Sequence, residues 1–208
     1  MDHLLAILTA LLVSLPAWHE DTETLEERTD RMGTIASAVL LTADQATCSD
    51  DYMMSCTPVW PGDRDELAIL LVTLAWYESR LSERIHSGLC RPGECDYEAV
   101  HHPITGKLVS ETFRARTMWQ MHYAPRLMSR SEWNSMSGQS LEATATAAWA
   151  ASKLLGAMAR SCKTHHPNSC ILTIYAGAKT LPYLGAKPRL DTYRELLGRY
   201  QAQKNPDE

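Results

Sequence analysis

The sequence lacks three features that would place it in a class at once: a long apolar run, an excess of positive charge, and a block rich in glycine or proline. No apolar run reaches the roughly 20 residues of a membrane-spanning helix, so we expect no stable membrane span. The formal net charge of −5 argues against a general nucleic-acid binder. Gly and Pro number 10 each among 208 residues, of which 45% are hydrophobic. A collagen-like or wholly disordered chain is therefore excluded, and one well-packed domain is expected.

Charge is distributed unevenly along the chain. Residues 1–66 contain 13 acidic and 3 basic side chains, whereas residues 67–208 contain 12 acidic and 17 basic ones. A mildly cationic C-terminal part would attract an anionic polymer over a long range. Two solvated surfaces of opposite sign would explain the same counts.

The six cysteines occur as three close pairs: Cys48 with Cys56, Cys90 with Cys95, and Cys162 with Cys170. An even number in local pairs predicts three short-loop disulfides, which require an oxidising compartment. This pairing rests on proximity, since six cysteines allow many connectivities.

Structural zinc is the alternative use of these cysteines. His165 and His166 lie between Cys162 and Cys170, and His101 and His102 follow Cys95. Neither cluster contains the Cys-x-x-Cys spacing typical of a zinc site, so we expect no metal.

The apolar run from Leu4 to Trp18 has the length of a signal-peptide core, and Ala17 could precede a cleavage point. The first three residues carry no Lys or Arg, and Leu15 is large for a residue near the cleavage point. Residues 1–17 are thus a signal peptide, a short anchor, or an N-terminal apolar helix that packs on the core and ends at Pro16.

Caps and helical periodicity predict one mainly helical domain over residues 22–203. Helices are expected over residues 22–46, from Asp63 to about Arg80, and over residues 140–160 and 169–178, with a last helix from Pro188 onward. An interrupted helix is expected over residues 110–128. Residues 86–110 lack helical periodicity and predict loops with a small hairpin near residues 104–109.

Glu78 follows a strongly apolar segment of the chain, in the run Ala75-Trp76-Tyr77-Glu78-Ser79. Aromatic neighbours and the carboxyl end of a helix both disfavour the ionised carboxylate, so the group could be protonated near neutral pH. That is the requirement for a general acid that protonates a glycosidic oxygen. The alternative is an ion pair with Arg80, with Arg84 or with an arginine from elsewhere in the chain.

Three short motifs resemble those of the soluble lytic transglycosylases and goose-type lysozymes, in the family's order. Residues 78–81, Glu-Ser-Arg-Leu, resemble the E-S-x-(F/L) that carries the catalytic glutamate. Residues 117–120, Thr-Met-Trp-Gln, resemble G-L-M-Q, with Thr117 in place of the glycine. Residues 174–177, Ile-Tyr-Ala-Gly, resemble Y-N-A-G, with Tyr175 either in the asparagine position or standing for the tyrosine itself. The resemblance covers about residues 64–180.

The resemblance implies a lysozyme-like fold, mainly α within an α+β class: a helical bundle around a central buried helix, with a loop or hairpin insertion stapled by disulfides. It implies cleavage of peptidoglycan at the β-1,4 bond between N-acetylmuramic acid and N-acetylglucosamine, with Glu78 as general acid and without a cofactor. Ser79, Trp119, Gln120 and Tyr175 would bind the substrate. A hydrolysing enzyme would need a second carboxylate to activate water, for which Asp96 is the candidate, whereas an anhydro-forming lytic enzyme would need none.

Two other functions fit the same residues. One is a lysozyme-like protein that binds glycan without cutting it, and the other is a secreted helical module stabilised by zinc. The enzyme hypothesis predicts a secreted, periplasmic or virion-associated protein whose partner is a peptidoglycan strand. It leaves open whether the target is the owner's wall or that of another cell.

Overall fold

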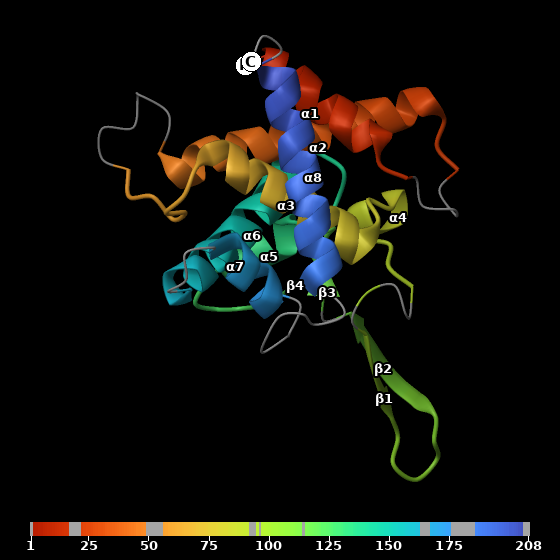
Figure 1. Cartoon of the computed structure of the whole chain (residues 1–208). Coiled ribbons are helices and arrows are strands. Elements are labelled where there is room, and N and C mark those ends of the chain that lie inside the picture. Colours follow the sequence, from red (N-terminus) through yellow and green to blue (C-terminus); the bar gives the residue numbers. More distant parts are fainter. Residues whose placement is uncertain are drawn as a thin grey trace.

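The computed structural model describes residues 2–16, 22–48, 56–91, 95, 97–113, 115–162, 167–175 and 186–205. It is mainly helical, with two small antiparallel pairs of strands (Figure 1). The helices are α1 (Asp2–Ser14), α2 (Leu25–Thr47), α3 (Arg64–Ser79), α4 (Glu83–His86), α5 (Arg130–Ser135), α6 (Leu141–Ser161), α7 (Pro167–Tyr175) and α8 (Ala186–Lys204). The strands are β1 (Tyr97–His101), β2 (Leu108–Phe113), β3 (Ala115–Arg116) and β4 (Met121–His122).

Helix α3 is the centre of the bundle. It packs against α2, α6 and α8, and its apolar side chains from Leu67 to Ala75 are buried on every side. A helix that is apolar all round is stable only inside a core, as its sequence predicts. It begins at the N-cap Asp63, whose carboxylate accepts hydrogen bonds from the backbone N–H groups of Asp65 and Glu66.

The expected helix starts are confirmed where a capping residue marks them. Thr24 and Glu27 form the expected capping box of α2. Helix α7 starts at Pro167, slightly before the expected cap at Asn168 or Ser169, because proline suits the first helical position. Helix α8 starts at Ala186, so Pro188 lies within its first turn, where the missing N–H group costs no hydrogen bond.

The described residues between 110 and 128 form strands and turns in place of the expected interrupted helix, which corrects the sequence prediction. Strand β2 runs to Phe113, and the short β3–β4 pair encloses a turn at residues 117–120. Backbone pairing with β1 decides the structure as far as Phe113, with Tyr97 opposite Phe113 and Val100 opposite Ser110. Beyond it, β3 and β4 pair with each other. The hairpin is thus longer than residues 104–109, which lie mainly in its turn. Short apolar runs do not distinguish helix from strand when the partner strand is unknown.

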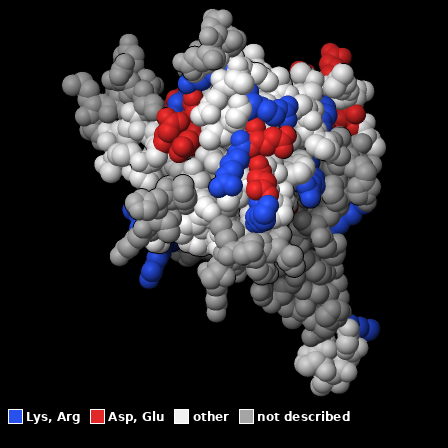
Figure 2. Space-filling model, viewed as in Figure 1, with Lys and Arg blue, Asp and Glu red and all other residues white. Residues whose placement is uncertain are grey.

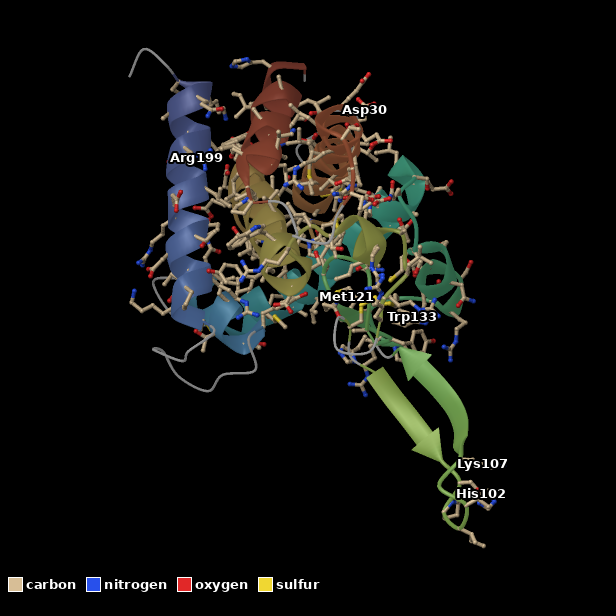
Figure 3. All side chains as sticks on the ribbon, turned by 90° about the vertical axis from the view of Figure 1, so that its right-hand side faces the viewer. Asp30, His102, Lys107, Met121, Trp133 and Arg199 are labelled. Carbon is tan, nitrogen blue, oxygen red and sulfur yellow. A yellow bond between two sulfur atoms is a disulfide. The ribbon has the colours of Figure 1, made fainter. Side chains whose placement is uncertain are left out.

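The β1–β2 hairpin projects from one end of the helical body (Figure 1). Figure 3 places His102 and Lys107 at its tip, and Met121 and Trp133 in the body near its base. The residues of the tip, 102–107, are all exposed.

Helix α1 packs against α2 and α8, with Leu8, Leu11 and Leu12 buried. Arg28 donates a hydrogen bond to the carbonyl of Leu15 over 2.9 Å. Helix α1 therefore packs as expected for an N-terminal apolar helix on the core, one of the three interpretations of residues 1–17.

Within the described residues, no helix combines the length and the apolarity that a membrane crossing needs.

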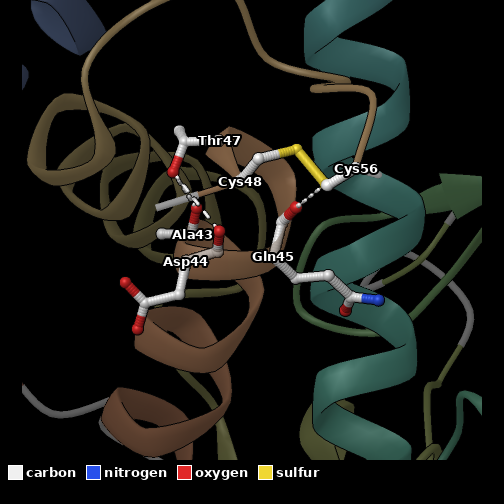
Figure 4. Close-up of a disulfide and its surroundings, with 6 residues drawn as sticks. All are labelled: Ala43, Asp44, Gln45, Thr47, Cys48 and Cys56. Atoms are coloured by element: carbon white, nitrogen blue, oxygen red, sulfur yellow. Dashed lines mark hydrogen bonds between the residues drawn. A yellow bond between two sulfur atoms is a disulfide. The ribbon is translucent and has the colours of Figure 1, made fainter. Parts of the chain in front are cut away.

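Three disulfides join the pairs expected from proximity: Cys48–Cys56, Cys90–Cys95 and Cys162–Cys170. The first connects the end of α2 to a segment that crosses α6 (Figure 4). That segment is held by the N–H groups of Val59 and Trp60, which both donate to the carbonyl of Ala46, and by Arg160, which donates to the carbonyl of Val59. Because all six sulfurs are in disulfides, they are not available as thiolate ligands for the alternative zinc site.

Gly156 is the point at which this segment touches α6, and a Cβ there would lie 1.9 Å from the carbonyl oxygen of Val59. We expect Gly156→Ala to lower the free energy of unfolding by about 1–3 kcal/mol, since backbone must move, despite the higher helix propensity of alanine. Gly198→Ala in α8 meets no atom within 4 Å and is the matched control. It should raise the same free energy by roughly 0.5–1 kcal/mol. Urea unfolding of both variants tests the contact, and equal effects of the two substitutions would contradict it.

Candidate functional site

A pocket of about 620 Å³ opens where the end of α3, the β3–β4 turn, α6 and α7 meet. Its wall is mixed, with a carboxyl, an amide, an imidazole and a phenol set among apolar side chains. The lining residues are Glu78, Cys95, Ala115, Gln120, Met121, His122, Ala124, Leu127, Leu154, Met158 and Tyr175. A pocket of this volume is within the range that holds small ligands or a few sugar rings.

Glu78 lies in the last turn of α3, which ends at Ser79. Arg80 and Leu81 both adopt left-handed backbone conformations, with φ of 54° at each. The hydroxyl of Ser79 donates to the carbonyl of Ala75 and accepts from the N–H of Leu81. Arg31 of α2 donates to the carbonyl of Leu81 over 2.8 Å and fixes the far side of the turn. The end of α3, and with it the carboxylate, is therefore rigidly placed.

The carboxylate of Glu78 is paired with Arg189, whose Nη2 lies 2.6 Å from Oε1. Only 19% of the Glu78 side chain and 16% of the Arg189 side chain are exposed. The ion pair is the alternative to a protonated general acid, and the arginine comes from a distant part of the chain. Arg80 does not take that role and stacks instead over the ring of Trp76, at 4.2 Å from its centroid.

Tyr175 lies at the end of the described part of α7 and donates its hydroxyl hydrogen to the carbonyl of Trp119. Burial, and then the nearby carboxylate of Glu78, raise the pKa of this phenol well above its usual range. Tyr175 is thus a neutral hydrogen-bond donor at any physiological pH, and it ties α7 to the turn that carries Gln120.

Gln120 is presented by a strained turn. Thr117 and Gln120 have left-handed backbone conformations, with φ of 69° and 47°. Glycine adopts such a conformation at low cost, which explains physically why a glycine suits the position of Thr117. The side-chain amide of Gln120 donates to Cys95 Sγ over 3.2 Å and so connects this turn to the Cys90–Cys95 disulfide.

The structure brings three of the predicted site residues together, since Glu78, Gln120 and Tyr175 all line the pocket. The other two predicted contacts are buried behind its wall. Ser79 is 4% exposed and fixes the turn after α3, and Trp119 is fully buried with its Nε1–H donated to the carbonyl of Leu71. Their placement supports the wall of the pocket and offers a ligand no direct contact. Asp96 lies outside the described residues, as do Ala176 and Gly177 of the third motif.

Sequence reasoning missed Arg189 and His122. Arg189 lies in the first turn of α8, beyond the motif-bearing region, and no local pattern connects it to Glu78. His122 lies on β4, two residues after Gln120 and so beyond the motif at residues 117–120, and no pattern in the sequence marked it as a pocket residue.

The pocket offers a carboxyl group for proton transfer, an amide for hydrogen bonding and an apolar floor of methionine and leucine side chains. Among the described residues, no group of three or more His, Cys, Asp or Glu side chains is arranged to hold a metal ion.

On the face of the molecule shown in Figure 2, the central Lys and Arg side chains lie beside Asp and Glu side chains, and the others are scattered over the lower part. The described basic side chains on this face form no single cationic patch that would attract a polyanion. On α8, for example, Lys187 is paired with Asp191 and Arg199 with Glu195.

Comparisons of the chain with protein-family models, with curated proteins and with solved structures found no significant match.

Proposed function

We propose that this protein cleaves peptidoglycan at the β-1,4 bond between N-acetylmuramic acid and N-acetylglucosamine, within a lysozyme-like helical fold. One observation carries the proposal. Glu78, Gln120 and Tyr175 come from three motifs far apart in the sequence, and they line one pocket. Motifs that resemble a glycan-cleaving family in residue type and order are thus also juxtaposed in space.

In the proposed reaction Glu78 donates a proton to the glycosidic oxygen as the bond to the muramyl carbon breaks. Gln120 offers its amide to the sugar or its acetamido group, and the apolar floor of Met121, Leu154 and Met158 receives the less polar face of the ring. Tyr175 acts indirectly, because its hydroxyl is already used in holding the turn at Trp119.

The positive charge that develops at the muramyl carbon must then be captured by an oxygen. Attack by the muramyl 6-hydroxyl gives an anhydro sugar and needs no second carboxylate. Attack by water requires a carboxylate about 6.5–9.5 Å from the acid, a role for which Asp96 is the candidate. The three disulfides support action in an oxidising compartment, which we propose to be secreted, periplasmic or virion-associated.

Mass spectrometry of the soluble products from purified peptidoglycan tests this function. Fragments one water lighter than the hydrolysed ones would identify a lytic transglycosylase, and fragments with reducing-end muramic acid would identify a hydrolase. Release of no fragments by the folded, disulfide-intact protein between pH 4 and pH 8 would reject the proposal.

The second candidate is a glycan-binding protein without cleavage, and the ion pair between Glu78 and Arg189 favours it, since a carboxylate held by arginine is poorly suited to donate a proton. Cosedimentation with peptidoglycan, without release of fragments, would be its signature.

A further inference from the structure

Two arginines and two aromatic rings stack on one another beside the pocket. The guanidinium carbon of Arg130 lies 4.0 Å from the centroid of the Tyr123 ring. That of Arg116 lies 4.9 Å from the centroid of the Trp133 ring. The two rings contact each other, with their centroids 5.8 Å apart and their planes tilted by 58°. These four residues, from β3, α5 and the start of the segment that joins β4 to α5, are called the arginine–aromatic cluster below.

The cluster adjoins the pocket through the β3–β4 pair. Ala115 precedes Arg116, and His122 precedes Tyr123. Ala115 and His122 are register partners, and both line the pocket. Figure 3 places Trp133 on the side of the body away from α8, whereas Figure 2 views the molecule with α8 in front. Trp133 therefore lies away from the face on which acidic and basic side chains are mixed.

Acidic side chains are scarce in this part of the sequence. Residues 114–136 contain four arginines and one acidic residue, Glu132. The carboxylate of Glu132 is already engaged, since Lys153 Nζ lies 3.0 Å from it and it caps α5. Among the described residues, no carboxylate forms an ion pair with Arg116 or with Arg130. The cluster therefore presents two cations without a described counter-charge.

Stacking on a ring prepares a guanidinium to bind a planar anion. The ring covers one face of the guanidinium and restricts its rotation, while the N–H groups at its edge can still donate within its plane. Arg130 is exposed, and no hydrogen bond joins it to a described residue. Arg116 donates to the carbonyl of Trp133 over 3.4 Å, which leaves most of its five N–H groups for other acceptors. A carboxylate fits the edge of such a guanidinium with two parallel hydrogen bonds.

We propose that the arginine–aromatic cluster binds a carboxylate carried by the glycan strand, with Arg130 as the main contact, and thereby selects acidic strands over neutral ones. This inference rests on the proposed function. N-acetylmuramic acid differs from N-acetylglucosamine by a lactyl ether that ends in a carboxyl group. That group is either an ionised carboxylate or the attachment point of a peptide with carboxylates of its own. In both cases the anion is carried by the sugar whose bond is broken.

Binding of soluble glycan strands tests the inference without cleavage. Affinity is measured in the full-length Glu78→Gln protein, with and without the further change Arg130→Gln, and circular dichroism confirms that both are folded. We expect Arg130→Gln to weaken binding of peptidoglycan strands by about tenfold, since it removes a hydrogen bond to a charged group. Binding of chitin oligomers, which carry no carboxylate, should not change. Arg194→Gln, at an exposed position on α8, is the matched control and should bind peptidoglycan strands as its parent does.

Strands stripped of their peptides by an amidase identify the source of the carboxylate. An effect of Arg130→Gln that persists on stripped strands assigns the contact to the lactyl group, and an effect confined to peptide-bearing strands assigns it to the peptide. Equal weakening for chitin and peptidoglycan would overturn the inference and leave the cluster a structural role. Unchanged binding of peptidoglycan strands in Arg130→Gln, or no binding by the parent protein, would overturn it as well.

The same binding experiment separates this inference from the proposed function. If the wild type releases no fragments while binding still depends on Arg130 and on the carboxylate, the cleavage proposal fails and the anion site stands. If the wild type releases fragments while Arg130→Gln binds strands with unchanged affinity, the cleavage proposal stands and the anion site fails.

Discussion

Replacing Glu78 with glutamine is expected to reduce the release of soluble fragments from peptidoglycan by about 100- to 10,000-fold, the contribution typical of a general acid. Glutamine has nearly the same shape, and its carbonyl oxygen can still accept a hydrogen bond from Arg189, which is 2.6 Å from the carboxylate in the wild type. The turn after α3 is held by Ser79 and Arg31 and does not depend on the charge of Glu78. The loss should therefore appear in the cleavage rate while the protein stays folded.

Glu132→Gln is the matched control for this experiment. Glu132 is also paired with a cation, Lys153, at 3.0 Å, but it lies on α5 and does not line the pocket. We expect wild-type rates in this variant. Wild-type rates in Glu78→Gln as well would remove Glu78 from the mechanism and assign the proton transfer to another group.

Acidification below pH 6.5 is expected to destabilise the fold through His86, by roughly 5 kcal/mol in total. His86 is 4% exposed, and burial, followed by repulsion from Arg31, lowers its pKa to about 3. In the unfolded chain the same imidazole takes up a proton near pH 6.5. Its contribution to stability is therefore complete above pH 6.5 and is lost progressively as the pH falls toward 3.

The hydrogen bonds around His86 explain why the neutral ring is held. Nε2 lies 2.8 Å from Thr144 Oγ1, and this hydroxyl already donates to the carbonyl of Ser140, so Nε2 is the donor. Nδ1 is buried and makes no hydrogen bond to any described residue. Protonation of Nδ1 would place a charge near Arg31 without compensation.

Urea unfolding at a series of pH values between 7 and 4 measures this effect. His86→Gln can still donate to Thr144 but does not titrate in this range, so its stability should depend less on pH, by up to about 1.4 kcal/mol per pH unit. His102→Gln, at the exposed tip of the hairpin, controls for the loss of a histidine. Parallel pH dependence in wild type and His86→Gln would contradict the buried neutral imidazole.

The parts of the fold that are visible in the sequence are those that local chemistry determines. Thr24 with Glu27 and Asp63 with Glu66 mark two helix starts because a cap is a contact between near neighbours in the chain. The apolar run after Asp63 indicates the central helix because a helix that is buried on all sides has no polar face. The disulfides followed from the proximity of their cysteines along the chain.

The parts that the sequence did not indicate depend on partners far along the chain. Residues 110–128 contain short apolar runs that fit a helix or a strand. Pairing of β2 with β1 and of β3 with β4 determines which of the two forms up to His122. Arg189 is separated from Glu78 by most of the domain, and its role follows from the packing of α8 on α3. By contrast, Glu78, Gln120 and Tyr175 could be proposed in advance because a resemblance connected them before any contact was known.

The contact between Gln120 and Cys95 makes one wall of the pocket depend on the oxidation state of two cysteines. Cys95 lines the pocket and is also half of a disulfide that closes a loop of a few residues at the base of the hairpin. With both thiols reduced, this wall has no covalent tether, and Gln120 contacts a loop that is no longer closed. Conditions that reduce the Cys90–Cys95 pair should therefore loosen the pocket on this side while Trp119 and Tyr175 continue to hold the other.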